Sequence, residues 1–588
     1  VTSLDEALQK LTPSFSSMTN GMGTTLSLNG LPDDYFIFLE NGKRLYGDDT
    51  YARINVAKIK RIEILNGASS ALYGTNAIGG VINIITDDVK NAINVSSDTR
   101  YASKGRFTQS VNIDVNTGKF GSYTSYRRQQ AEGWQLNPYE ENSKTHELEE
   151  TGKVASTGFY ANTVNQKFTF DATDKLSFYA RGGYYDNKTR RPYEAYDYNI
   201  LHETFNYGIG AQYMINKGNY ITADCYADHF SSSYCFFKDN KTYNGKAGEE
   251  QVRKRTRNHN LSIKGIFKLG NRHKLSVGTE YIVDVLKSQT DNIAKEDAYT
   301  LALFAQDEIK LLRNLQALIG VRYIYHENFK NHATPNVALM YKPGKFNFRA
   351  SYAAGFRTPT LSELYATDIA KKNDRLTIGN LDLKPEKNNY FSLSAEYVHE
   401  RFSVSVNAFY NNIRDMIDYN TIATGDKAME QYGHKEVRQR DNIAEAKVHG
   451  INVSANAYLG AGFNLSGGYT HLNTQDVELE QPIDKSIKNA YNINAQWAHS
   501  WKIYRLNINL NGRFNSKRFS KSYGYAPEYQ LWDLNTRHSF NLKSVIIEPG
   551  CGMENLFDYM DDRPYNSNYA TLTPGRSFYI SLSLKFKS

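Results

Sequence analysis

The residues best suited to bind a ligand lie in the polar stretch 45–53. Tyr46 and Tyr51 offer aromatic faces, and Asp48 and Asp49 between them offer carboxylates. A large flat chelate can stack on such aromatic faces. Plain solvation of an exposed loop explains the same residues equally well, so both interpretations stay open.

A second acidic stretch, 186–199, carries oxygen ligands of the kind that Ca²⁺ prefers. Its candidate ligands are Asp186, Glu194, Asp197 and Asn199. Because the spacing follows no fixed register, solvated acids are the better explanation, and Asp186 and Asp197 are kept only as weak calcium candidates. We predict no other metal site.

No catalytic pattern is found: the chain lacks a nucleophile elbow, zinc-ligand spacing and a phosphate loop. The net charge of +8 is mildly basic. One local cluster consists of Arg253, Lys254, Arg255 and Arg257. Elsewhere the basic residues are scattered, so this cluster fits a solvated loop, or contact with anionic lipid headgroups, better than a nucleic-acid site.

The composition favours one very large sheet. The 588 residues include 44 Tyr and 29 Phe but only 13 Pro, and the mean hydropathy is −0.59. A membrane barrel combines an apolar outer band, aromatic girdles and a polar lumen, which gives such a composition. No run approaches the ~20 apolar residues of a membrane-spanning helix, whereas a spanning strand needs only ~9–11 residues of alternating polarity.

Past residue 91 the chain alternates strictly between apolar and small polar residues. The clearest stretches are 402–410, 451–459, 504–510 and 578–586. A period of two gives one apolar and one polar face. A soluble sandwich shares this period, but a sheet of this length must curl, split or close, and a sheet that spans lipid must close.

The connections differ in length in a way that is typical of an outer-membrane barrel. Tight turns are expected at Asn116–Gly118 and Lys342–Lys345. Long polar loops are expected at 186–199, 238–256, 367–387 and 421–441.

Two cysteines ten residues apart, Cys225 and Cys235, suggest either a loop disulfide or one strand. On one strand they would lie ~33 Å apart, which excludes a bond, at ~3.3 Å per residue. We favour the strand.

The first ninety residues have a different, mixed α/β pattern. Val1–Leu11 has helical spacing, with Leu4, Ala7, Leu8 and Leu11 on one face. Short buried strands are expected at Tyr35–Leu39, Ile62–Leu65 and Val81–Ile85. We therefore predict a small globular domain over residues 1–90 and a transmembrane barrel over 91–588.

Several motifs then carry a family resemblance over almost the whole chain. Arg61–Thr86 (RIEILNGASSALYGTNAIGGVINIIT), preceded by the turn Asn41–Arg44, closely resembles the plug domain of TonB-dependent outer-membrane receptors. Gly355–Pro359 (GFRTP) and Asn380–Glu386 (NLDLKPE) resemble the FRAP and NP-x-L boxes that are usual in haem and related metal-chelate receptors. Glu554–Asp558 (ENLFD) and the terminal strand also fit. The chain departs from the family's usual residues at Ala68, Thr358 and Leu381.

The resemblance implies a transmembrane antiparallel β-barrel of about 22 strands with the plug in its lumen. It also implies the outer membrane of a Gram-negative bacterium and an inner-membrane TonB complex that displaces the plug. We find no TonB box and no signal peptide from Val1 onwards, and we expect a processed or trimmed chain. No intrinsic cofactor is expected, and a surface lipoprotein that captures the ligand first is a further expected partner.

The plug residues are expected to act in structure and gating. Gly67, Gly74, Gly79 and Gly80 would allow the sharp turns of a plug in a narrow lumen. Arg61 and Glu63 are expected to pair with barrel charges, with a solvated plug face as the alternative. The loops expected to face outward are 20–24 and 45–53.

The loop between the two boxes is expected at the extracellular rim. Its candidate ligand contacts are Tyr365, Thr367, Asp368 and Asn380. In haem receptors that this chain resembles, a histidine follows the FRAP box, and imidazole is a natural axial ligand of haem iron. Thr367 stands near that place here, so the sequence counts against haem, although His434 in another loop could substitute.

The function favoured from the sequence is therefore active uptake of a bulky, scarce metal chelate, with cobalamin preferred. Haem and a ferric siderophore are alternatives, the latter because a basic protein attracts an anionic chelate. A passive porin or adhesin barrel is a competing class, but an open channel has no use for a folded domain in its lumen. A barrel enzyme would need a Ser–His site, which we cannot place.

Overall fold

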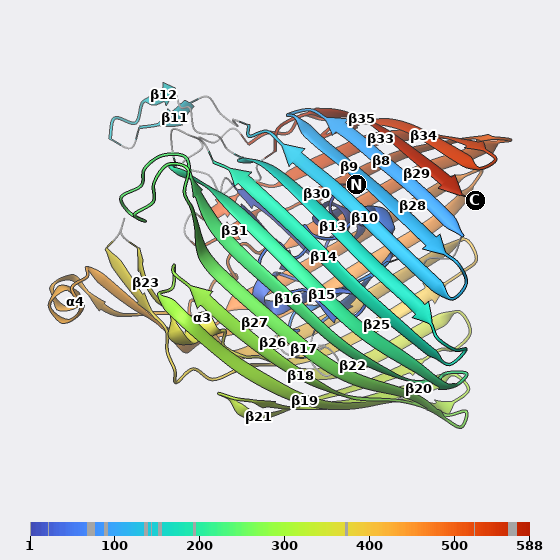
Figure 1. Ribbon diagram of the computed structural model, residues 1–588, viewed down its shortest axis with the longest axis horizontal. Coiled ribbons are helices and arrows are strands. Elements are labelled where there is room, and N and C mark those ends of the chain that lie inside the picture. The colour runs from blue at the N-terminus through green and yellow to red at the C-terminus, as the bar shows by residue number, and fades with distance from the viewer. Residues whose placement is uncertain are drawn as a thin grey trace.

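In the computed structural model, the chain after residue 92 winds into a closed antiparallel barrel around the N-terminal residues (Figure 1). The barrel has 22 membrane-spanning strands, as predicted. The described residues are 2–20, 23–67, 74, 77–86, 92–134, 139–142, 144–150, 156–191, 196–370, 374–521, 524–561 and 573–587. Ala68, Glu194 and part of the loop 20–24 lie outside them.

The wall is built from long neighbouring strands. Its first half is β8 (Ile93–Ala102), β9 (Arg106–Asn116), β10 (Phe120–Ala131), β13 (Gly158–Asp171), β14 (Leu176–Arg190), β15 (Tyr198–Asn216), β16 (Asn219–Phe236), β17 (Glu250–Leu269), β18 (His273–Ser288), β19 (Ile293–Leu312) and β20 (Leu315–His326). Its second half is β21 (Lys330–Tyr341), β22 (Phe346–Arg357), β25 (Glu386–Val398), β26 (Phe402–Thr424), β27 (Glu436–Gly460), β28 (Phe463–Asp476), β29 (Asn489–Trp501), β30 (Tyr504–Asn515), β33 (Tyr529–Leu542), β34 (Val545–Glu554) and β35 (Ser577–Lys587). The pairing of β35 with β8 closes the ring, so the sheet has no free edge.

The alternation of apolar and polar residues in the sequence gives the barrel wall an apolar outer face and a polar inner face. On β35 the apolar series Phe578, Ile580, Leu582 and Leu584 is exposed on the outer surface. Such a band on every strand is what a lipid-solvated wall requires. Among the described residues, no helix is long and apolar enough to cross a membrane.

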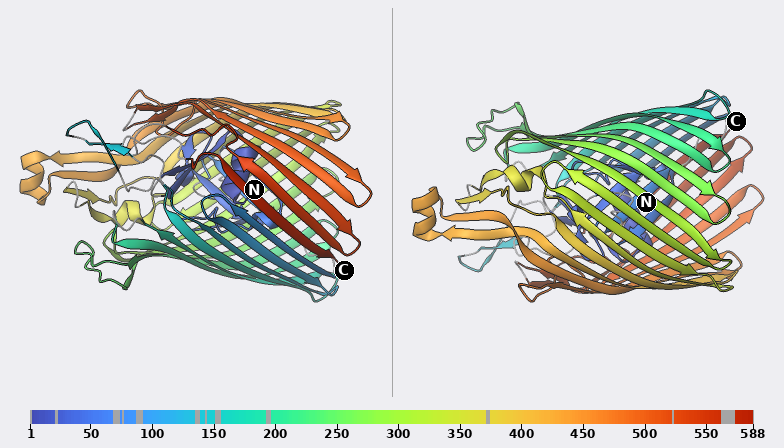
Figure 2. Two further views of the ribbon diagram at one scale, coloured as in Figure 1. Left: turned by 90° about the horizontal axis from the view of Figure 1, so that it is seen from above. Right: turned by 90° about the horizontal axis from the view of Figure 1, so that it is seen from below.

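The two ends of the barrel differ, as predicted. Tight turns such as 117–119 and 342–345 join the strands at one end, and the long connections gather at the other (Figure 2). The predicted long loops are partly strand, however. The stretch 421–441 is mostly the paired ends of β26 and β27, joined by α4 (Gly425–Tyr432), and β17 already begins at Glu250.

The extracellular end carries a few smaller elements. They are β11 (Tyr139–Glu141), β12 (Leu148–Glu150), α3 (Leu361–Tyr365), β23 (Thr367–Ala370), β24 (Arg375–Ile378), β31 (Arg518–Ser520) and β32 (Gly524–Ala526). β24 pairs with β27, which ties the loop after β22 to the projecting hairpin of β26 and β27.

The N-terminal plug is a mixed α/β unit inside the wall. Its elements are α1 (Leu4–Leu11), β1 (Phe15–Asn20), β2 (Gly23–Leu28), β3 (Leu31–Pro32), η1 (Asp33–Tyr35), β4 (Phe36–Glu40), β5 (Lys43–Arg44), η2 (Val56–Lys58), β6 (Ile59–Asn66) and β7 (Gly80–Thr86). Leu4 and Leu8 of α1 are buried in its core with strand residues such as Phe36 and Ile82, and the Ser3 side chain caps the helix. Leu11 was expected on the same face but is 64% exposed, because the helix ends there.

The plug is fastened to most of the surrounding wall by polar contacts. Lys58 pairs with Asp114 at 2.5 Å, and Lys10 pairs with Asp533 at 2.9 Å. On the same side as Lys10, the Arg513 guanidinium donates to the Phe15 carbonyl at 2.7 Å. Cys225 and Cys235 lie on the single strand β16 and are free thiols, which confirms the strand interpretation.

Candidate functional site

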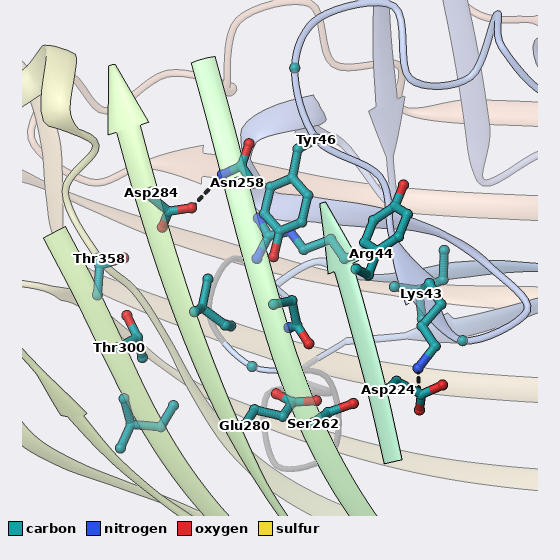
Figure 3. Close-up of a pocket in the computed structure, with 18 of the residues that line it drawn as sticks. Lys43, Arg44, Tyr46, Asp224, Asn258, Ser262, Glu280, Asp284, Thr300 and Thr358 are labelled. Atoms are coloured by element: carbon teal, nitrogen blue, oxygen red, sulfur yellow. Dashed lines mark hydrogen bonds and ion pairs between the residues drawn. The ribbon is translucent and has the colours of Figure 1, made fainter. Parts of the chain in front are cut away.

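The plug does not fill the lumen evenly. A cavity of about 1280 Å³ lies between the plug hairpin β4–β5 and the inner faces of β16 to β20 (Figure 3). Lys43, Arg44 and Tyr46 approach it from the plug, and Asp224, Asn258 and other wall residues face them. This cavity is the best candidate for a ligand site in the described part of the chain.

Strand β17 shows how far the cavity extends. Every second residue of this strand from Lys254 to Lys264 lines it. At ~3.3 Å per residue this run is about 33 Å long. It begins near the extracellular end of the strand and ends beside Leu261 and Ile263, whose exposed side chains belong to the apolar outer band. The cavity therefore extends along the wall from the extracellular rim into the outer part of the membrane span.

The lining is rich in cations. Ten Lys and Arg residues and six Asp and Glu residues line the cavity. Some are paired: Lys43 contacts Asp224 at 2.5 Å, and the Arg322 guanidinium contacts Glu280. The remaining excess of positive charge in a partly enclosed space attracts an anion, because low-dielectric walls focus the field.

Tyr46 is held at the cavity by its neighbours. Its backbone N–H donates to Asp228 Oδ2 at 3.0 Å, and the Arg44 guanidinium lies 5.1 Å from its ring centroid. Arg53 pairs with the same Asp228 carboxylate at 3.0 and 3.1 Å, and both side chains are buried. Burial raises the pKa of Tyr46, so its hydroxyl stays a neutral donor.

The two family boxes meet at the outer end of the cavity. Arg357 of the first box donates two hydrogen bonds of 3.0 Å to Glu363 and also contacts Glu386 of the second. Thr360 and Glu363 form a capping box on α3. Burial tends to raise the pKa of Glu363, but Arg357 lowers it below its usual value, so this carboxylate stays charged.

This buried cluster fixes the short segment 358–364, here called the ledge, over the cavity. Residues 358–364 line its outer end together with Arg440. From the plug, the Tyr35 hydroxyl donates to Glu386 at 3.3 Å. The boxes therefore shape the rim of the cavity and connect it to the plug.

The predicted plug-loop residues separate into two groups. Tyr46 lines the cavity, whereas Tyr51 packs against the plug core. Asp48 lies 3.5 Å from Lys254 at the cavity mouth. Asp49 contacts His202 Nδ1 at 2.7 Å. Burial raises the pKa of Asp49, but the hydrogen bond and charge of His202, together with Asn187 and Arg53, lower it below its usual value. For Tyr51 and Asp49 the contacts are with the protein itself, and ligand contact stays a prediction.

The predicted loop residues lie beyond the ledge. The cavity lining ends at Leu364, so Tyr365 packs beside it, near Leu383. Thr367 and Asp368 belong to β23. Asn380 forms a turn in which its side chain accepts from the Asp382 N–H at 2.9 Å. Of the described residues of this loop, those at 358–364 line the cavity, whereas 365–370 and 374–380 do not.

Arg61 and Glu63 pair with each other at 2.7 Å instead of with barrel charges, and their side chains are 54% and 37% exposed. The prediction of a plug–barrel pair was therefore wrong. Both residues lie on β6 two positions apart and so point to the same face. They line the cavity.

The plug glycines occupy restricted positions. Gly67 has φ +79°, and a Cβ there would lie 2.2 Å from the Tyr390 ring. A Cβ at Gly80 would lie 2.5 Å from the Leu65 carbonyl oxygen. Gly79 packs against Leu31, and Gly74, also at positive φ, faces Arg322. These contacts agree with a structural role.

The calcium candidates are not assembled into a site in the described residues. Asp186 accepts from the Asn162 amide at 3.1 Å, and Asp197 accepts from Asn240 at 2.8 Å. No group of three or more His, Cys, Asp or Glu there could hold a metal ion. Calcium in the loops stays a prediction. His434, the candidate haem ligand, contacts Asp374 Oδ1 at 2.9 Å.

Most of the cavity residues were not predicted from the sequence. Arg44, Lys264 and Arg440 were not singled out, and Lys254 was grouped with three neighbouring cations. The signal lies further along the strand: Leu261 and Ile263 form its apolar side, and this places the even-numbered residues Lys254, Thr256 and Asn258 on the lumen side.

Comparisons with known proteins agree with this architecture. A family model described as "TonB dependent receptor-like, beta-barrel" matches residues 105–548, and one described as "TonB-dependent Receptor Plug Domain" matches residues 1–81. A mutant ferric enterobactin receptor from Pseudomonas aeruginosa, solved with enterobactin, is 17% identical, with a TM-score of 0.82 over 100% of this chain and 97% of that chain.

Two further solved structures are similar. The siderophore receptor PirA from Acinetobacter baumannii is 16% identical, with a TM-score of 0.80 over 100% of this chain and 96% of that chain. The FrpB iron transporter from Neisseria meningitidis is 14% identical, with a TM-score of 0.77 over 100% and 97%. At these identities, the likeness shows a common fold.

Proposed function

This chain belongs to the TonB-dependent receptor family, and we propose that it carries an anionic ferric siderophore across the outer membrane. Receptors of this family lie in the Gram-negative outer membrane and interact with TonB. They are transporters and not enzymes. The surface lipoprotein stays a prediction from the resemblance.

The excess of cations in the cavity carries the choice of ligand. A ferric tris-catecholate is a net anion, so the ten Lys and Arg residues of the lining favour it over a ligand without negative charge. Tyr46, Tyr179, Tyr220 and Tyr226 add aromatic faces to the same lining.

The similar solved structures also support a siderophore. Two are described as a ferric enterobactin receptor and a siderophore receptor, and the third as an iron transporter. The preference for cobalamin rested on a missing histidine alone. The siderophore alternative fits better than cobalamin. His326 is the one histidine among the described lining residues, and its Nδ1 accepts a hydrogen bond from the Asn328 N–H at 3.1 Å. The charge of the lining, and not a histidine, therefore carries the choice of a siderophore over haem.

The shape of the cavity suggests the route of the ligand. Away from the cavity, the plug is anchored to the wall by pairs such as Lys58–Asp114. The β4–β5 hairpin of the plug borders the cavity and contacts the wall there through the Lys43–Asp224 pair. In our proposal, TonB-driven movement of this hairpin widens the existing cavity, and the ligand passes along β16 to β20. Complete removal of the plug is then unnecessary.

Calorimetry on the detergent-purified receptor tests the choice of ligand. We expect sub-micromolar binding of a ferric catecholate and much weaker binding of haemin and cobalamin. Replacing Arg44 and Lys254 by Gln should weaken binding by about 0.5–1 kcal/mol per charge, the upper range for exposed ion pairs. Lys60→Gln is the matched control, because Lys60 is an exposed plug lysine outside the cavity lining.

Two outcomes would contradict the proposal. Tight binding of haemin or cobalamin alone would assign a different ligand. Equal loss of affinity in Lys60→Gln and in the cavity variants would mean that the charge of the cavity does not select the ligand.

A further inference from the structure

A group of cations also lies on the outer surface of the barrel. Because Lys254, Thr256 and Asn258 line the internal cavity, the alternating residues Arg255 and Arg257 point outward. Both are exposed. The basic cluster of the sequence is therefore divided by the sheet into one lumenal lysine and two external arginines.

A third cation lies beside them on the next strand. Lys287 of β18 is directly opposite Arg255 in the register and is also exposed. Like charges that face each other across two strands destabilise a sheet. In the described part of the chain, Arg255, Arg257 and Lys287 form no ion pair with a carboxylate. An anion from outside the protein would relieve the repulsion between these cations.

The position of the group matches the headgroup region. On the same outer face, Leu261 and Ile263 are 52% and 47% exposed, and Tyr281 of β18 is 44% exposed. These residues belong to the apolar band that meets lipid. Arg257 lies four residues further out than Leu261, about 13 Å along the strand, just beyond the hydrocarbon.

The neighbouring side chains complete a polar patch. His229 of β16 is opposite Arg257, and Ser231 is opposite Arg255. The other side of Ser231 faces Glu203 of β15, which accepts from the Tyr184 hydroxyl at 2.9 Å. Glu203 therefore marks the edge of the positive patch.

We propose that Arg255, Arg257 and Lys287 bind the phosphate groups of a phosphorylated glycolipid in the outer leaflet. Arginine forks match phosphate oxygens in pairs, and lysine adds a point charge. Three adjacent cations fit a headgroup with more than one phosphate. Bound lipid would remove the repulsion between Arg255 and Lys287 and fix the receptor in its leaflet.

Native mass spectrometry of the delipidated receptor in detergent tests the site. The probes are bisphosphorylated lipid A, its dephosphorylated form and inorganic phosphate. We expect the wild type to bind the bisphosphorylated lipid at least tenfold more tightly than the dephosphorylated one. The triple variant Arg255→Gln, Arg257→Gln, Lys287→Gln should lose about tenfold in this preference.

Two variants serve as controls. Arg255→Lys with Arg257→Lys keeps the charge and should retain most of the binding, which separates loss of charge from misfolding. Arg128→Gln removes an exposed arginine of β10 whose guanidinium donates to Gln130 at 3.1 Å, and it should change nothing. Ferric-chelate binding, measured in parallel, should be unchanged in every variant.

The other outcomes overturn the site. An undiminished preference in the triple variant, or equal binding of dephosphorylated lipid A by the wild type, would show that apolar contact alone holds the lipid. Binding of inorganic phosphate as tight as that of the lipid would make this a phosphate site instead. Since no arm of the test uses transport, its failure is distinct from failure of the proposed function.

Discussion

Asp228→Ala should loosen the plug more than any exposed charge change. Asp228 of β16 accepts two contacts from Arg53, at 3.0 and 3.1 Å, and one from the Tyr46 N–H. The side chains of Arg53 and Asp228 are 6% and 0% exposed. Truncating the aspartate leaves a buried guanidinium and a backbone donor without their acceptor.

The expected cost follows from this burial. Removing one partner of a buried ion pair costs about 3–5 kcal/mol, because the remaining charge stays desolvated. Asp228→Asn keeps an acceptor and the shape, so it should cost less, roughly 1.5–3 kcal/mol, the range for a hydrogen bond to a charged group. Replacing both partners by apolar residues of similar volume, Arg53→Met with Asp228→Leu, should recover most of the loss.

Urea titration of a plug label measures these differences. A fluorophore on Lys60→Cys, in a background with the three native cysteines replaced by serine, reports unfolding of the plug inside the barrel. The free energy follows from linear extrapolation, provided that the slope is unchanged. Glu63→Gln is the control: it breaks the exposed Arg61–Glu63 pair and should cost at most about 1 kcal/mol.

Two results would refute this reasoning. An Asp228→Ala receptor that loses less than about 1 kcal/mol would show that the buried pair does not anchor the plug. A double apolar variant as unstable as Asp228→Ala would show that the loss comes from shape or packing and not from an uncompensated charge.

Two further predictions concern the movement and seating of the plug. Cysteines at Lys43 and Asp224 joined by a short bis-maleimide should block uptake. The linked receptor should still bind the ligand, because the two substitutions remove one charge of each sign and leave the positive excess of the lining unchanged. Either single cysteine treated alike should transport, and transport by the linked receptor would exclude movement of the hairpin. Gly67→Ala should destabilise the plug strongly, because the new methyl group would overlap the Tyr390 ring. Gly42→Ala is the control: Gly42 has a similar φ of +77° but nothing within 4 Å of the position of its Cβ. It should cost only about 1 kcal/mol of backbone strain. Equal losses in the same urea assay would mean that the contact with Tyr390 is unimportant.

The wall and the plug elements could be predicted because their signals are local. The alternation at 578–586 fixes which side of β35 meets lipid, whatever its neighbours are. The helix at the N-terminus and the strand Val81–Ile85 are likewise readable from spacing and apolar runs. The number of strands came only from the family resemblance, since no single strand carries that information.

The cavity could not be predicted because it depends on where the plug leaves the wall uncovered. Lys254 and Arg255 are neighbours in sequence, yet the sheet places one in the lumen and the other towards lipid. The loop 365–380 was favoured for its place between two motifs, but the buried pairing of Arg357 with Glu363 and Glu386 brings 358–364 over the cavity instead. Such long-range pairings have no signature in a single sequence.

Energised transport can be measured as uptake of a radiolabelled ferric catecholate by cells that carry this receptor as their only such transporter. We expect saturable uptake that stops when a protonophore collapses the proton gradient. Uptake should also weaken when Arg44 and Lys254 are replaced by Gln, while the Lys60→Gln receptor transports normally. Uptake that continues without the gradient, or that ignores the charges of the cavity, would contradict the proposed function.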